Sequence, residues 1–105
     1  MATPYTLGVW TVTHGREEEF VAAWIELAEW TAATVEGAGT GTLLRDTDDG
    51  RRFVSVGPWK DLDTIQRWRE EPGWNERVGR IREMLESFEP STLELVAARG
   101  GRERG

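Results

Sequence analysis

The alternation of hydrophobic and polar positions predicts three strands and a long helix in the first half of the chain. Residues 5–13 (YTLGVWTVT) are rich in β-branched and aromatic side chains, which is typical of a strand. Between residues 16 and 35, apolar residues recur at helical spacing, and the glutamates at the start of this segment favour a helix N-terminus. The glycine-rich stretch 36–41 is expected to end this helix. Two further strands are expected over 42–46 and 52–59, joined by a turn that contains an Asp-Gly pair.

In the second half of the chain, the pattern predicts two helical segments and a final strand. Asp61 is expected to cap a short helix that stops before Pro72. The apolar residues that follow share one helical stripe as far as Phe88, so a further helix is expected to run until Pro90 ends it. The last strand is then expected over residues 91–98.

The resulting order, β-α-β-β-α-β, predicts a single α+β domain over residues 1–98, of the ferredoxin-like split β-α-β type with a four-stranded antiparallel sheet. The tail, residues 99–105, is glycine-rich and charged and is expected to be disordered. Right-handed crossovers place both helical segments on one face of the sheet. The first strand nevertheless carries apolar residues on both faces, with Trp10 on one and Val9 on the other. Because the helices cover only one face, we predict a homodimer in which two sheets pack face to face.

One face of the third strand carries small residues at its middle. Ser55 and Gly57 lie between Phe53 and Trp59 on the same face of the strand, the one expected to face the helices. Gly8 of the first strand is small as well. Small side chains there leave room for an apolar cavity between the sheet and the helices, with Trp59 as a wall. The alternative is that the indole rings of Trp10, Trp24 and Trp68 fill that space and leave no cavity.

Composition narrows the classes of function. The chain has 13 Lys and Arg against 19 Asp and Glu, a net charge of −6, which argues against binding nucleic acid or an anionic membrane. No apolar run approaches the roughly 20 residues of a membrane span, and the N-terminus lacks the pattern of a signal peptide, so a cytoplasmic protein is expected. With no cysteine and one histidine, His14, the chain lacks the residues for disulfides, thiol catalysis or a cysteine–histidine zinc site, and no metal is expected. His14 follows the first strand, where a solvated loop residue is expected; the alternative is that His14 serves as a general base.

Two segments of the chain resemble the antibiotic biosynthesis monooxygenase family. The first is HGREEEFVAAWIELAE (14–29), a glycine followed by an acidic helix start after the first strand. The second is LLRDTDDGRRFVSVGPWKDLDTIQRW (43–68), in which the tryptophan of the third strand precedes an acidic helix cap. The resemblance covers residues 5–97. It implies a dimeric α+β barrel with its site between the sheet and the helices, on the face where Ser55 and Gly57 lie.

Members of this family that need no cofactor oxidise polycyclic phenols to quinones, and the substrate anion itself reacts with O₂. Their pattern has an Asn four residues before the strand-three Trp, a Tyr six residues after it and an Arg on the last helix. Trp59 matches the Trp, with Ser55 in place of the Asn and Ile65 in place of the Tyr. Gly79 falls at the Arg position, close to Arg77. The catalytic candidates are therefore Trp59 and Arg77, and the substrate-binding candidates are Ser55, Trp68, Trp10, Trp24 and Arg80.

Haem-degrading members of the family have an Asn on the first strand, a Trp on the helix after the third strand and an axial His about ten residues later. Trp68 matches the Trp, but Gly8 stands at the Asn position and Val78 at the His position, so haem degradation is not expected. The sequence therefore predicts a cofactor-independent monooxygenase for a flat aromatic, phenolic or quinol-type molecule. Two alternatives remain: a dimeric module that binds a small molecule without catalysis, and a structural dimer whose tryptophans are packing.

Overall fold

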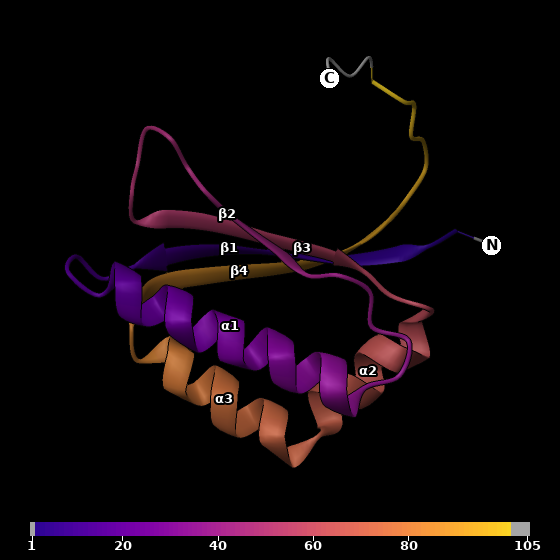
Figure 1. Ribbon diagram of the computed structural model, residues 1–105, viewed down its shortest axis with the longest axis horizontal. Helices are drawn as coiled ribbons and strands as arrows, with labels where there is room; N and C mark the ends of the chain where they lie inside the picture. The colour runs from indigo at the N-terminus through magenta and orange to yellow at the C-terminus, as the bar shows by residue number, and fades with distance from the viewer. Residues whose placement is uncertain (1, 102–105) are drawn as a thin grey trace.

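The computed structural model describes residues 2–101 and shows an antiparallel sheet of four strands covered on one face by helices (Figure 1). The strands lie in the order β2-β3-β1-β4. This confirms the predicted α+β, ferredoxin-like fold. Residues 102–105 of the predicted disordered tail lie outside the described residues. The elements are β1 (Pro4–Val12), α1 (Glu17–Thr34), β2 (Thr42–Arg45), β3 (Arg52–Pro58), α2 (Leu62–Glu70), α3 (Pro72–Arg82) and β4 (Leu85–Glu94).

The predicted start of the second helix is confirmed by its cap. The Asp61 side chain accepts hydrogen bonds from the Thr64 backbone N–H at 2.8 Å and from the Thr64 hydroxyl at 2.6 Å. These bonds satisfy one of the free N–H groups at the N-terminus of α2. They also favour the charged form of the carboxylate. The pKa of Asp61 is therefore lowered, most by the bond from the Thr64 hydroxyl and next by the bond from the Thr64 backbone N–H.

The predicted bounds of the last helix and the last strand were wrong. Helix α3 ends at Arg82 instead of continuing to Pro90, and β4 occupies 85–94 instead of 91–98. The helical spacing of the apolar residues misled here because Phe88 belongs to the sheet: it lies opposite Trp10 in the register, and the two rings stack with centroids 4.0 Å apart. Pro90 is tolerated because β4 is an edge strand that pairs only with β1.

The core lies between the helix-facing side of the sheet and the helices. The Phe20 ring of α1 packs between Trp10 and Phe53, with ring centroids 5.4 Å and 5.0 Å apart. The residues buried in this core are Trp10, Val12, Phe20, Leu27, Phe53, Val78, Ile81 and Met84.

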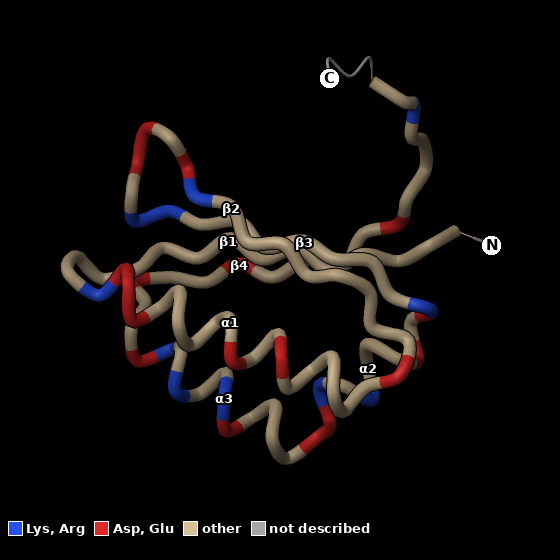
Figure 2. Tube along the Cα trace, in the orientation of Figure 1, with Lys and Arg blue, Asp and Glu red and all other residues tan. Residues whose placement is uncertain are grey.

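The other face of the sheet carries an apolar patch on β1 and β3, bordered on β4 by Glu89 and Ser91, which lie opposite Val9 and Leu7. Val9 pairs with Val54 and Leu7 with Val56, and the alternation of side chains points all four away from the buried Trp10. They remain partly exposed. Figure 2 shows that charged residues gather on the helices and on the loop between β2 and β3, while the strands are mostly uncharged. The two-faced apolar pattern is thus present, and the homodimer stays a prediction.

Candidate functional site

A cavity of about 390 Å³ lies between the helix-facing side of the sheet and the helices. This volume falls in the range of roughly 300–1,000 Å³ that is usual for small-molecule pockets. The predicted hollow is therefore present, and the indole rings border it without filling it. Large apolar residues in its lining include Trp10, Trp24, Leu27, Trp68, Val78 and Phe88.

One wall of the cavity is built around Gly8 of β1. Gly8 lies opposite Ser55 in the sheet, and a Cβ on Gly8 would lie only 3.0 Å from Trp10 Nε1, 3.0 Å from Phe88 Cε1 and 3.1 Å from Ser55 Oγ. The missing side chain lets these three groups meet. The Trp10 indole N–H donates a hydrogen bond to Ser55 Oγ at 2.9 Å, which fixes the ring on the wall. Ser55 thus contributes a hydroxyl to an otherwise aromatic surface.

Gly57 lines the cavity, as its small size suggested, and it also lets a loop pass close to the strand. A Cβ on Gly57 would lie 3.1 Å from the Thr40 carbonyl oxygen and 3.3 Å from Gly41 Cα, so the loop between α1 and β2 crosses directly over it. Gly39, Thr40 and Gly41 all line the cavity. The sequence pattern predicts only that this glycine-rich loop ends a helix. The loop glycines Gly39 and Gly41, together with Gly57 on the strand, could have indicated that the two backbones approach each other closely.

Two further tryptophans are held by threonine hydroxyls. The Trp68 indole N–H donates to Thr31 Oγ1 at 2.9 Å, and the buried Thr31 hydroxyl donates in turn to the Leu27 carbonyl at 2.8 Å. Trp59 donates to Thr6 Oγ1 at 2.8 Å. The Trp59 ring packs against Trp68 with centroids 4.7 Å apart, but Trp59 is not one of the residues that line the cavity. Trp68 thus lines the cavity, and Trp59 packs against Trp68 without lining the cavity itself.

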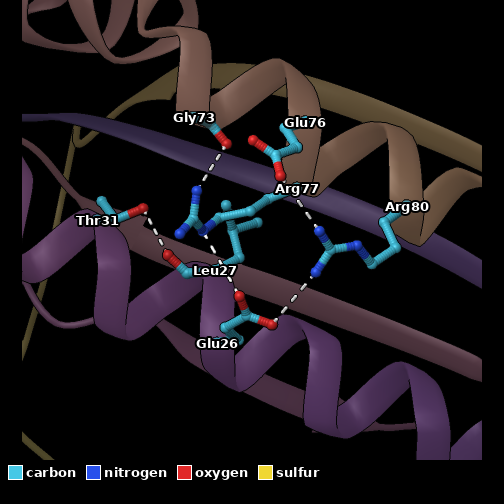
Figure 3. A network of polar contacts seen from close by, with 7 residues as sticks. All are labelled: Glu26, Leu27, Thr31, Gly73, Glu76, Arg77 and Arg80. Atoms are coloured by element: carbon cyan, nitrogen blue, oxygen red, sulfur yellow. Dashed lines mark hydrogen bonds and ion pairs between the residues drawn. The ribbon is translucent and has the colours of Figure 1, made fainter.

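The two predicted cationic residues lie at the α1–α3 interface, outside the cavity lining (Figure 3). Arg77 Nε lies 3.8 Å from Glu26 Oε1, Nη1 donates to the Gly73 carbonyl at 3.2 Å, and the guanidinium sits 4.8 Å from the centre of the Trp30 ring. Arg80 pairs with the same Glu26 carboxylate at 3.7 Å. These contacts join two helices. The role of either arginine toward a substrate stays a prediction.

The cavity itself is nearly free of charge. Among the described residues that line it, there is no histidine, and the charged members are Glu29 of α1 and Arg69 of α2, both exposed. Within residues 2–101, no three acidic or histidine side chains gather in a way that could hold a metal ion. No helix in this part of the chain is both long and apolar enough to span a bilayer. The arrangement offers aromatic surfaces, the hydroxyls of Ser55 and Thr31, and a charged mouth.

Comparison with known proteins agrees with this architecture. The family model described as antibiotic biosynthesis monooxygenase matches residues 5–79. The chain is similar to SnoaB of Streptomyces nogalater, a cofactor-independent oxygenase, with 25% identity, a TM-score of 0.82, and 96% of this chain and 97% of SnoaB covered. It also shares its fold with a putative antibiotic biosynthesis monooxygenase from Nitrosomonas europaea, at 17% identity and a TM-score of 0.81, covering 93% of this chain and 94% of that one. Protein SO0527 of Shewanella oneidensis has the same fold, at 20% identity and a TM-score of 0.82, covering 92% and 94%. No curated protein matches the chain by sequence.

Proposed function

The chain belongs to the antibiotic biosynthesis monooxygenase family, and we propose that it is a cofactor-independent monooxygenase that oxidises a flat phenolic or quinol-type molecule in the cavity beneath its helices. The observation that carries the proposal is the cavity of about 390 Å³, bordered by indole rings and reached from solvent. The likeness to SnoaB, a cofactor-independent oxygenase, supports the same class of reaction.

Binding would rest on stacking and on one hydroxyl. The Trp10, Trp24 and Trp68 rings line the cavity, and each can offer a face or an edge to a planar aromatic ligand. Ser55 Oγ already accepts the Trp10 N–H, so its own O–H is available as a donor to an oxygen of the ligand. A partly buried hydroxyl that donates to a substrate oxygen would stabilise negative charge there as the substrate loses its proton.

The reaction we propose draws its electrons from the substrate. A phenol–anthrone substrate loses a proton to give its anion, which combines with O₂; one oxygen atom becomes the new quinone carbonyl, and the other leaves as water with the two hydrogens of the oxidised carbon. In this scheme the protein holds the anion in a sheltered site and orients it for attack. Among the described residues of the lining, Glu29 at the mouth is the only one with a carboxylate, so proton loss to solvent is part of the proposal.

A second candidate is a module that binds the same class of molecule without catalysis. The absence of a histidine among the described lining residues favours it, because stacking and shape alone are enough for binding. The two candidates share the site and differ only in turnover.

We also propose that the protein works as a homodimer. The helix-free face of the sheet presents Leu7, Val9, Val54 and Val56 side by side, and these side chains are only partly buried in one copy of the chain. A sheet with two apolar faces and helices on one of them is stabilised when a second sheet covers the other.

The test combines turnover with a variant that fills the cavity. The protein is incubated in air with hydroxylated anthrones and hydroquinones, without added cofactor, and quinone absorbance is followed. Ala28→Leu places a larger side chain in the cavity lining, and Ala22→Leu makes the same change at an exposed position of α1 that is not part of the lining. We expect quinone formation with the wild type and Ala22→Leu, and its loss in Ala28→Leu.

Tryptophan fluorescence distinguishes the two candidates. Quenching by these ligands without quinone formation would favour the binding module. Neither quenching nor turnover across the panel would overturn both.

A further inference from the structure

The mouth of the cavity carries an arginine that the proposed reaction does not use. Arg69, in the last turn of α2, directly follows Trp68 and is the only cationic residue among the described residues that line the cavity. Its side chain is exposed. Within the described part of the chain, the six ion pairs all belong to other arginines: Arg16, Arg51, Arg52, Arg77 and Arg80. The Arg69 guanidinium is therefore available to a ligand.

Arg69 and Ser55 line the cavity from different elements, Arg69 from α2 and Ser55 from β3. Helix α2 lies over the end of the sheet where β1 begins (Figure 1). Ser55 is paired with Gly8, further along β1, and Trp10 lies beyond it. Both Ser55 and the exposed Arg69 line the cavity, so a planar molecule with an oxygen at Ser55 can extend its other end toward Arg69 and the solvent.

We propose that Arg69 determines substrate specificity by binding a carboxylate substituent on the part of the aromatic ligand that reaches the mouth. This inference rests on the proposed function of the cavity. A guanidinium presents paired N–H donors whose geometry matches a carboxylate, and its plane stacks on aromatic rings, so it suits an acidic group attached to a flat ligand. A local cation also offsets the general repulsion of anions by a chain whose net charge is −6.

Glu29 of α1 lines the same cavity and carries the opposite charge to Arg69. Its carboxylate would attract a cationic substituent in place of an anionic one. The two residues are not joined by an ion pair within 4 Å in the described structure, so Glu29 does not neutralise Arg69 by direct contact. Arginine offers the more directional contact, and the choice between anion and cation is an outcome of the test.

The experiment compares two ligands of the same shape and different charge. Anthraquinone-2-carboxylate and anthraquinone-2-carboxamide are titrated into the full chain, and binding is followed by quenching of tryptophan fluorescence. We expect the wild type to bind the carboxylate about three- to tenfold more tightly, the range for a charge-assisted contact at an exposed position. The preference should shrink as sodium chloride is raised from about 50 to 500 mM, because salt screens exposed charges.

Two matched variants assign the preference to one residue. Arg69→Gln should bind both ligands equally, with the affinity for the carboxamide unchanged. Arg67→Gln is the control: Arg67 lies in the same last turn of α2 but is not part of this lining, so the preference should persist. Glu29→Gln should keep or increase the preference for the carboxylate.

Each other outcome overturns a defined part of the reasoning. If Arg69→Gln retains the preference, or if the wild type binds the two ligands equally or favours the carboxamide, the role of Arg69 is overturned while the aromatic site stands. If neither ligand quenches the wild type and an uncharged anthraquinone also fails to do so, the aromatic site itself is overturned, and the role of Arg69 with it.

Discussion

Gly8→Ala tests whether close approach around one glycine holds the cavity wall together. A methyl group at this position would lie 3.0–3.1 Å from atoms of Trp10, Phe88 and Ser55, which is shorter than the ordinary contact distance of 3.4–4 Å. None of the three can withdraw freely. The Trp10 N–H is bonded to Ser55 Oγ at 2.9 Å, and the Trp10 ring is stacked on Phe88 with centroids 4.0 Å apart. The substitution must therefore weaken at least one of these interactions.

Two opposing contributions set the size of the effect. Overpacking a well-filled site costs about 1–3 kcal/mol. Replacing glycine in a strand interior recovers about 0.5–1 kcal/mol, because glycine loses more conformational freedom on folding. The two ranges combine to a net loss of about 0–2.5 kcal/mol in the free energy of unfolding. Because three neighbours lie at 3.0–3.1 Å at once, we expect Gly8→Ala to fall in the upper part of this range, at about 1–2 kcal/mol. At about 4–8 °C per kcal/mol for a domain near this size, the midpoint of thermal unfolding should fall by several degrees.

The assay is urea unfolding followed by circular dichroism and tryptophan fluorescence, with all proteins at one concentration because association would contribute to the measured stability. Gly79→Ala is the matched control. It lies in the exposed face of α3, where a Cβ would meet nothing within 4 Å, and it should gain about 0.5–1 kcal/mol from helix propensity. If Gly8→Ala is as stable as the wild type while Gly79→Ala gains as expected, the packing described around Gly8 is refuted.

Three other predictions follow from single contacts. Thr31→Val removes the hydroxyl that accepts the Trp68 N–H; it should cost about 1–3 kcal/mol of unfolding free energy in urea melts, and a cost near zero would contradict the role of this bond. Asp61→Asn should lower the thermal midpoint at neutral pH, because Thr64 hydrogen bonds lower the pKa of the carboxyl. A lowered pKa stabilises the fold above the unfolded-state value of about 3.9. The difference from wild type should therefore fade as the pH drops through the folded-state pKa, and a constant difference down to strongly acid pH would argue against it. Val54→Asp, on the helix-free face of the sheet, should give a monomer by light scattering at micromolar concentration where the wild type is a dimer; a monomeric wild type would contradict the dimer.

Local sequence rules predicted the parts of the fold that local interactions determine. The Asp61 cap depends on a side chain and a backbone N–H three residues apart, and the hairpin between β2 and β3 depends on a short turn. The last strand was not predictable in this way. Leu85 and Phe88 continue the helical spacing of α3, and only contact with Trp10, far away in the sequence, places Phe88 in the sheet. Tertiary packing outweighed the local periodicity.

In the candidate site, too, features set by local periodicity were predictable, and features set by tertiary packing were not. The alternation along β3 correctly indicated that Ser55 faces the helices and borders a hollow, because strand periodicity is a local property. The crossing of the α1–β2 loop over Gly57 could not be read from spacing, since it depends on where the loop returns to the sheet. Likewise, the helical stripe alone did not show that Arg77 turns toward Glu26 and Trp30 on α1.

The cavity persists because the indole N–H groups of Trp10 and Trp68, two of the three tryptophans in its lining, are already hydrogen-bonded. A buried indole N–H without an acceptor costs free energy, and a ring in that state would gain by rotating toward any available oxygen or by collapsing into free space. Here the Trp10 N–H bonds to Ser55 and the Trp68 N–H to Thr31, so each ring is held at the wall by a hydroxyl on a strand or helix. Collapse into the hollow would break these bonds and leave the N–H groups unpaired. The same small polar residues that look out of place in a core are thus what keeps the space open to a guest.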